Sequence, residues 1–194
     1  MVMQTILSTV HGSHLYGLAR PDSDHDSYRV VIGENKTYAR QRLQGDDDRL
    51  GIHLSRFLES VDKGVPQALE ALFSPVAELD PEWAPFLRGL RPGIINARTT
   101  YRRTILNFGL GNGGRTGAAA QRTDPVKLRR HALRLCLNLD ELVSTGRFNP
   151  RLTPGQARAV KAGAQLERTD FEDLLVRALG QAQIGKLHQE AMER

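Results

Sequence analysis

The chain has 194 residues, of which 40% are hydrophobic and 25% are charged. This length suits one ordinary domain or two small ones, and no apolar run approaches the ~20 residues of a membrane span. The N-terminus lacks the basic and apolar regions of a signal peptide, and Cys136 is the single cysteine, which excludes a disulfide framework. We therefore expect a soluble protein in a reducing, cytoplasmic compartment, with no membrane role.

The net charge of +5 is distributed unevenly along the chain. Residues 1–97 hold 10 Lys/Arg and 13 Asp/Glu, whereas residues 98–194 hold 17 and 9. Between Arg98 and Arg134 there are nine basic residues and one acidic residue, Asp124. Such a segment suits a polyphosphate or a nucleic acid, although a solvated basic face would give the same pattern.

The first half of the chain predicts strands and short helices. Apolar and β-branched residues predict strands over 4–10 and 26–32, and a third, short strand around 48–52. A tight turn and a short helix follow the first strand. Helical spacing of apolar residues predicts one helix from about Leu54 to Gly64 and another directly after Pro66.

The second half is predicted to be mainly helical. Four prolines between residues 75 and 92 indicate a connection with short helical pieces. Helices are expected over 126–145, after Thr153 and after Thr169. The expected organisation has three parts: an α/β core over 1–75, a proline-rich connection over 76–97 and a helical part over 98–194.

Two features in the segment 12–26 point to one chemical site. Asp24 and Asp26 are two residues apart, and in a strand such residues project to the same face, where two carboxylates suit an oxygen-ligated Mg²⁺. Gly12 and Ser13 follow the first predicted strand and open a helix, where backbone N–H groups and the positive dipole end favour phosphate. The pattern predicts a metal at one end and phosphates at the other.

This spacing resembles the nucleotidyltransferase signature of the DNA polymerase β-like superfamily, in which Gly-Ser is followed after about ten residues by Asp-x-Asp. The wider string GSHLYGLARPDSDHD is similar to a predicted nucleotidyltransferase family widespread in bacteria and their phages. Asp48, nine residues before Phe57, stands where that family carries a third Asp, and Asp46 in the same acidic run is the alternative. Further residues that resemble the family are Gly64, Pro66, Leu69, Glu70 and Leu72. Matching blocks run from about Ile6 to about Leu152.

The resemblance implies a polymerase β-like fold, an α/β core with a mixed sheet and helices, followed by a helical C-terminal part that closes a nucleotide cleft. It implies a metal-dependent nucleotidyltransferase, in which Asp24, Asp26 and Asp48 hold two Mg²⁺ ions, with Mn²⁺ as an alternative. A hydroxyl would attack the α-phosphate of an NTP, and pyrophosphate would leave. Gly12 and Ser13 would bind the β and γ phosphates. Neither the identity of the NTP nor the oligomeric state follows from the sequence.

Lys127, His131 and Arg134 have the spacing of one helical face, opposite a stripe of leucines. Together with Leu135, Leu142 and Thr145-Gly146 they are similar to the C-terminal helix of the family. The resemblance implies that the three side chains bind the triphosphate and neutralise charge on the leaving pyrophosphate. Without it, solvated Lys and Arg side chains and a boundary histidine are the ordinary interpretation.

The basic excess of the second half favours a nucleic acid end as acceptor, with RNA favoured over DNA. Tyr101 and Phe108 are the only aromatic residues of the basic segment, so we expect little sequence preference from base stacking. Two alternatives remain open. One is a non-catalytic nucleotide- or RNA-binding module, and the other is a protein-nucleotidylating (AMPylating) enzyme of the same fold.

Two further patterns carry less weight. His11, His14 and His25 lie near Asp24, but their spacing fits no familiar zinc motif. The stretch from Gly109 to Gly114 satisfies G-x-G-x-x-G, yet a dinucleotide fingerprint needs a strand before it, and none is predicted there. We interpret that stretch as a mobile loop beside the basic segment or as a gap in a helix that faces the active site.

Overall fold

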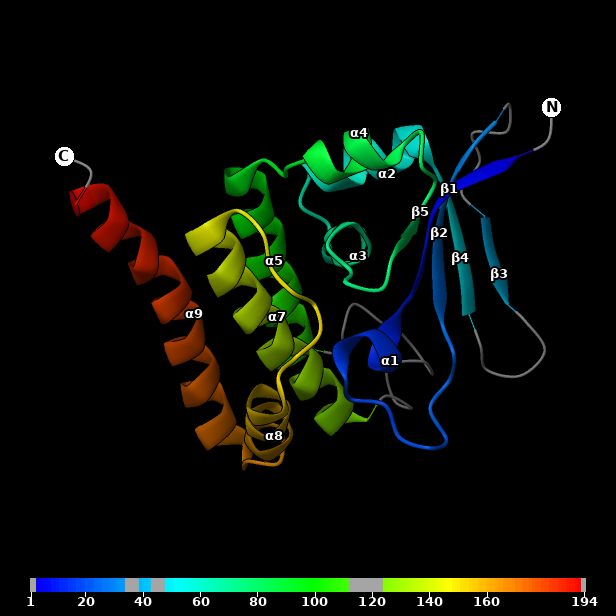
Figure 1. Ribbon diagram of the computed structural model, residues 1–194. Helices are drawn as coiled ribbons and strands as arrows, with labels where there is room; N and C mark the ends of the chain where they lie inside the picture. Colours follow the sequence, from blue (N-terminus) through cyan, green and yellow to red (C-terminus); the bar gives the residue numbers. More distant parts are fainter. Residues whose placement is uncertain (1–2, 34–38, 43–47, 112–123, 193–194) are drawn as a thin grey trace. The chain divides into compact units, whose positions relative to one another are not determined.

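The computed structural model describes residues 3–33, 39–42, 48–111 and 124–192, and at 39–42, 48 and 181–192 it describes the backbone alone (Figure 1). The chain divides into two compact units. Unit 1 comprises Met1–Gly93 and Asn149–Leu152, and unit 2 comprises Ile94–Phe148 and Thr153–Arg194. The chain first passes from unit 1 to unit 2 after Gly93, which lies within the predicted connection 76–97.

Unit 1 is built on a five-stranded sheet in the order β3-β4-β2-β1-β5. Its strands are β1 Gln4–Val10, β2 Ser27–Ile32, β3 Ala39–Arg42, β4 Asp48–His53 and β5 Glu78–Leu79. β2 and β4 pair in parallel, and the other neighbours pair antiparallel. The mixed sheet expected from the sequence is confirmed.

The core of unit 1 follows from strand alternation and one irregularity. Tyr28 and Val30 of β2 are buried and lie two residues apart, as expected for one face of a strand. In β1 the register shifts between Thr5 and Leu7, and Ile6 and Leu7 are both buried although they are consecutive. A bulge breaks the alternation, so β1 buries two neighbouring side chains.

The helices of unit 1 are α1 Gly12–Tyr16, α2 Leu54–Asp62, α3 Pro66–Leu72 and α4 Ala84–Gly89. α2 begins where the sequence predicts, because His53 Nδ1 accepts a hydrogen bond from the Ser55 N–H at 3.2 Å and so caps the first turn. Phe57 and Val61 bury its apolar face. α2 is followed by Gly64 at φ 64°, a left-handed conformation in which a β-carbon is unfavourable.

Unit 2 is helical, as predicted. Its helices are α5 Ile94–Gly109, α7 Pro125–Thr145, α8 Pro154–Gly163 and α9 Arg168–Met192. α7 is the central helix, since it contacts α5, α8 and α9, and Figure 1 shows α5, α7 and α9 side by side. Asp124 caps α7 by accepting from the Val126 N–H at 2.9 Å, and Gly146 ends it at φ 74°. Thr153 and Gln156 form a capping box that starts α8.

The sequence did not predict β3 or β5. β5 has two residues, lies within the proline-rich stretch and pairs Leu79 with Leu7 of β1. A strand of two residues has no alternation to detect, so its existence depends on the partner strand rather than on its own pattern. α4, in contrast, matches the short helical piece expected there.

None of the described helices combines the length and the apolar character that crossing a membrane demands.

Cys136 lies inside α7, and burial raises the pKa of its thiol to about 12. The reactive species of cysteine is the thiolate, so the folded protein should resist alkylation. We expect iodoacetamide at pH 8 to leave Cys136 unmodified in the native chain and to modify it in denaturant, as measured by intact mass. Comparable modification rates in both conditions would contradict the burial of this thiol.

Candidate active site

Three of the predicted site residues of unit 1, Gly12, Asp26 and Asp48, lie near the point where β2 and β4 begin. In the parallel pairing of these strands, Ser27 lies opposite Arg49, so Asp26 and Asp48 each stand one position before a paired residue. The backbone N–H of His11 donates to the Asp26 carbonyl at 2.9 Å and joins the end of β1 to the start of β2. The backbone therefore brings Asp26, Asp48 and the turn at Gly12 to one edge of the sheet.

Gly12 and Asp26 are in direct contact. A β-carbon built on Gly12 would lie 2.7 Å from Asp26 Oδ2, and Gly12 itself has φ 67°. The left-handed backbone makes any other residue unfavourable here, and a β-carbon would also require the Asp26 carboxylate to move. The first residue of α1 is thus suited to glycine by its backbone conformation. From the sequence, phosphate approach was the predicted reason for this glycine.

Asp24 lies in an irregular segment before β2, which begins at Ser27. The expectation that Asp24 and Asp26 share a strand face is therefore wrong in its premise, because alternation does not extend to Asp24. A turn shapes this segment instead: Ser23 N donates to the Arg20 carbonyl at 3.0 Å, and Arg20 N donates to Ser23 Oγ at 2.8 Å. Asp24 is exposed and Asp26 is half-buried, so both carboxylates are accessible.

The third carboxylate stays a prediction. Asp48 begins β4, but its side chain lies outside the described residues, as does the whole of the alternative Asp46. Among the described side chains, no group of three His, Cys, Asp or Glu could hold a metal ion.

α1 is held in place by a buried hydrogen bond. Tyr16 at its end donates from its hydroxyl to Glu70 Oε2 of α3 at 2.6 Å, and Glu70 is 1% exposed. Leu152 N donates to the Tyr16 carbonyl at 3.2 Å, and Leu18 N donates to the Ser13 carbonyl at 2.9 Å. A buried carboxylate is costly unless it is hydrogen-bonded, so the pair fixes the distance between α1 and α3. The sequence showed no sign of a partner for Glu70, which lies 54 residues from Tyr16.

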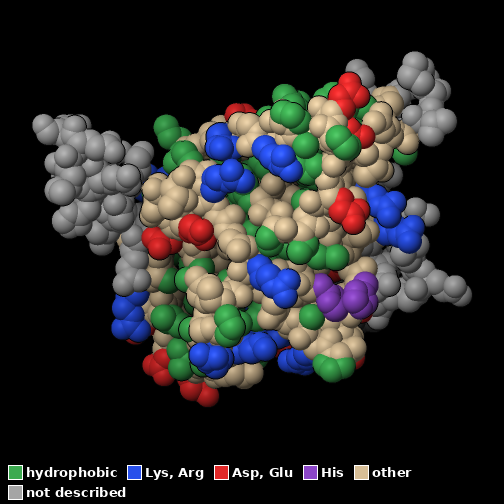
Figure 2. All heavy atoms as spheres, in the orientation of Figure 1, with side chains coloured by type: hydrophobic (Ala, Val, Ile, Leu, Met, Phe, Trp, Pro, Cys, Tyr) green, Lys and Arg blue, Asp and Glu red, His purple; other side chains and the backbone are tan. Residues whose placement is uncertain are grey.

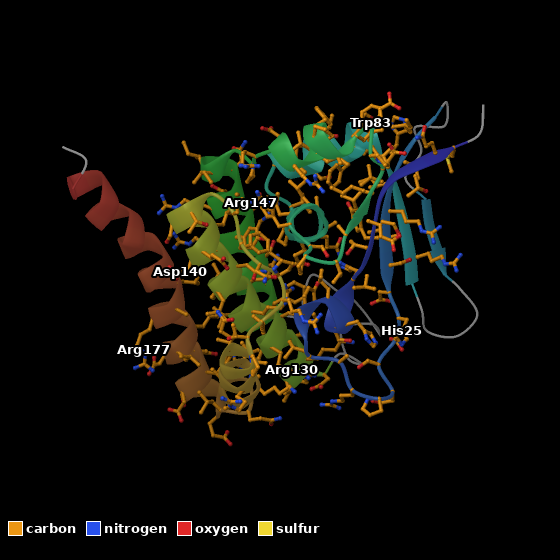
Figure 3. The ribbon with its side chains drawn as sticks, in the orientation of Figure 1. His25, Trp83, Arg130, Asp140, Arg147 and Arg177 are labelled. Atoms are coloured by element: carbon orange, nitrogen blue, oxygen red, sulfur yellow. The ribbon has the colours of Figure 1, made fainter. Side chains whose placement is uncertain are left out.

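Two histidines stack beside the acidic residues. The rings of His14 on α1 and His25 between Asp24 and Asp26 have centroids 3.9 Å apart and an interplanar angle of 22°. His14 Nε2 lies 3.2 Å from the Ser23 carbonyl. Figure 2 shows histidine side chains together at the surface, and Figure 3 labels His25 on the connection between α1 and β2. From the sequence, zinc binding was the only role suggested for these histidines.

The basic residues of α7 differ in exposure. Lys127 is exposed, His131 is half-buried with its ring centroid 5.3 Å from that of Phe108, and Arg134 is 3% exposed. The prediction of a face opposite the leucine stripe is therefore wrong for Arg134, which is buried as Leu133 and Leu135 are. α7 is packed against α5, α8 and α9. A residue opposite the leucine stripe of α7 can therefore still be buried by a neighbouring helix.

The basic segment on α5 has exposed cations and aromatic rings that are buried or half-buried. Arg102 and Arg103 are exposed, whereas Tyr101 is buried and Phe108 packs on His131. α5 continues to Gly109, so a helix rather than a strand precedes the glycine-rich stretch. The dinucleotide fingerprint is excluded on that ground, while residues 112–114 lie outside the described residues.

Comparison with known proteins gives one family. The model of RlaP, the RNA repair pathway DNA polymerase beta family, matches residues 2–189 of this chain. A search of curated proteins finds none that matches.

The contact between Gly12 and Asp26 can be tested by adding one methyl group. We expect Gly12→Ala to lower the free energy of unfolding by about 1–3 kcal/mol, because alanine is strained at this φ and its β-carbon meets the carboxylate. Gly89→Ala is the matched control, since a β-carbon there meets nothing within 4 Å. Thermal or urea unfolding measures both variants, and equal stability of the two would contradict the described packing.

Proposed function

The chain belongs to the RNA repair pathway DNA polymerase beta family, and from this premise we propose that it transfers a nucleoside monophosphate from an NTP to a hydroxyl acceptor and releases pyrophosphate. The observation that carries the proposal is the convergence of Gly12, Asp26 and the start of β4 at one edge of the sheet. Gly12 of the Gly-Ser pair and Asp26 of the Asp-x-Asp pair lie close together there, which supports the proposal.

The acidic residues fit a hard divalent cation. Asp24, Asp26 and Asp48 would hold Mg²⁺, with Mn²⁺ as the alternative, because carboxylate oxygens are the ligands that these ions prefer. Asp24 is exposed and Asp26 is half-buried, so neither residue is fully enclosed by the protein. When bound, two such ions would polarise the α-phosphate and lower the pKa of the attacking hydroxyl.

The phosphates would be bound by the backbone at the start of α1 and by cations. Gly12 and Ser13 open α1, and the first N–H groups of a helix have no partner within the helix. On α7, Lys127, His131 and Arg134 are assigned to the charge that develops on pyrophosphate. Lys127 is exposed and His131 is half-buried, whereas Arg134 is 3% exposed, so the assignment of Arg134 rests on the family resemblance alone.

We propose RNA, rather than DNA, as the acceptor. The description of the family places its members in an RNA repair pathway, and the exposed Arg102 and Arg103 supply cations beyond those assigned to the NTP. Such cations bind the phosphate backbone without reading its sequence.

The carboxylates can be tested by isosteric substitution. Asp24→Asn and Asp26→Asn should each lower label transfer from an α-labelled NTP to RNA by more than about a hundredfold, since each removes a metal ligand at constant volume. Asp48→Asn should lower turnover more than NTP affinity. Asp22→Asn is the matched control, because Asp22 is exposed in the same connection and is not assigned to the site.

Retained transfer in either Asp24→Asn or Asp26→Asn would refute the metal assignment, and loss of transfer in Asp46→Asn but not in Asp48→Asn would move the third ligand by two residues. Label that accumulates on protein instead of RNA would favour the protein-nucleotidylating alternative. NTP binding without any transfer would favour the non-catalytic module.

The acceptor assignment predicts a steep salt dependence. The affinity for RNA should fall by about one log unit per log unit of salt for each phosphate neutralised, and Arg102→Ala or Arg103→Ala should reduce that slope by about 1. Arg158→Ala, on the exposed surface of α8 and outside the basic segment, should leave the slope unchanged. Binding isotherms at several salt concentrations measure it, and a slope near zero for the unmodified chain would refute RNA binding through these cations.

A further inference from the structure

The stack of His14 and His25 is not used by the proposed chemistry. Its centroid distance of 3.9 Å and angle of 22° are those of two rings in nearly parallel contact. The chain brings them together across eleven positions, since His14 lies on α1 and His25 lies in the irregular segment before β2. The carbonyl of Ser23, 3.2 Å from His14 Nε2, fixes the inner ring.

The outer ring is presented to solvent at the site itself. His25 is exposed, whereas His14 is half-buried, so His25 is the more accessible ring of the pair. His25 stands between Asp24 and Asp26 in the chain, and His14 follows Ser13. Figure 3 shows that His25 extends from the connection beside α1.

The two aromatic rings of the basic segment are less available for stacking. Tyr101 is buried and contacts Phe148, whereas Phe108 is half-buried and its ring lies against that of His131 in a tilted arrangement. Single-stranded RNA is commonly bound by stacking an unpaired base on an exposed aromatic or histidine ring. In the described part of unit 1, the stacked rings of His14 and His25 lie next to the acidic residues in the chain, and a base can be added to this stack.

We propose that the His14–His25 pair is the stacking platform for the terminal base of the RNA acceptor, an inference that rests on the proposed function. A base on His25 extends the stack by one ring and places its own nucleotide beside Asp24 and Asp26, where the acceptor hydroxyl must react. The exposure of His25 suits the end of a long strand rather than a ligand that must be enclosed. The platform recognises the presence of a base and not its identity, because every base has an aromatic face.

The test separates the base from the rest of the strand. Two fluorescein-labelled single-stranded RNAs of equal length, one with an ordinary 3′-terminal nucleotide and one with an abasic 3′ terminus, are titrated by anisotropy at fixed salt and without NTP. The unmodified chain should bind the ordinary RNA at least about fivefold more tightly. His25→Ala should bind both RNAs with the lower affinity, and His25→Phe should restore the preference. Phe86→Ala, which removes an exposed ring from α4 of the same unit, should keep it.

Equal affinity of the unmodified chain for both RNAs would overturn the proposal, as would a preserved preference in His25→Ala. A parallel titration with NTP alone gives the third outcome: a loss of NTP affinity in His25→Ala as large as the loss of RNA affinity would assign the platform to the nucleotide base instead. These bindings need no turnover. If only the stacking proposal is wrong, the chain still transfers label but binds the two RNAs with equal affinity. If only the proposed function is wrong, the chain transfers no label but still binds the ordinary RNA more tightly than the abasic one.

Discussion

The contact of the Asp26 carboxylate with the Cα of Gly12 is the constraint on which the rest of the site depends. A β-carbon on Gly12 would approach Asp26 Oδ2 to 2.7 Å, and the positive φ of Gly12 disfavours any other residue, so a substitution here would displace the Asp26 carboxylate and strain the turn. The hydrogen bond from His11 N to the Asp26 carbonyl holds the same junction through the backbone. The parallel pairing of β2 with β4 then carries Asp48 to the same edge. One close approach thus links three separate segments.

Local signals predicted much of this structure. Gly12, Gly64 and Gly146 mark the turn and the two helix ends that the sequence analysis placed there, because each has a positive φ that other residues avoid. The capping residues Asp124 and Thr153 act within a few positions along the chain, so their helices could be placed from the sequence. β1, β2 and β4 could also be predicted, because the apolar and β-branched residues that indicate a strand lie within a few positions of one another.

Features that depend on distant partners were not predicted. Tyr16 and Glu70 form a hydrogen bond although they are 54 residues apart. The rings of His14 and His25 stack because the turn at Arg20 and Ser23 brings them together. Neither contact corresponds to a periodic pattern in the sequence from which it could be predicted. Arg134 has the helical spacing of a surface cation, but its burial is decided by what packs around α7. Periodicity determines the face on which a residue lies, while tertiary packing determines whether that face meets solvent.

The segment Asn149–Leu152 belongs to unit 1, although it follows α7 of unit 2 in the chain. Its Leu152 donates to the carbonyl of Tyr16, and the backbone of the same residue lies 3.7 Å from a β-carbon built on Gly17. A gene fragment that ends at Gly93 would therefore encode α1 without one of its supports. Recombination that exchanged the second half of the gene would replace a residue that touches the helix carrying Gly12 and Ser13. The segment Asn149–Leu152 and the helix α1 that it supports are consequently expected to diverge together.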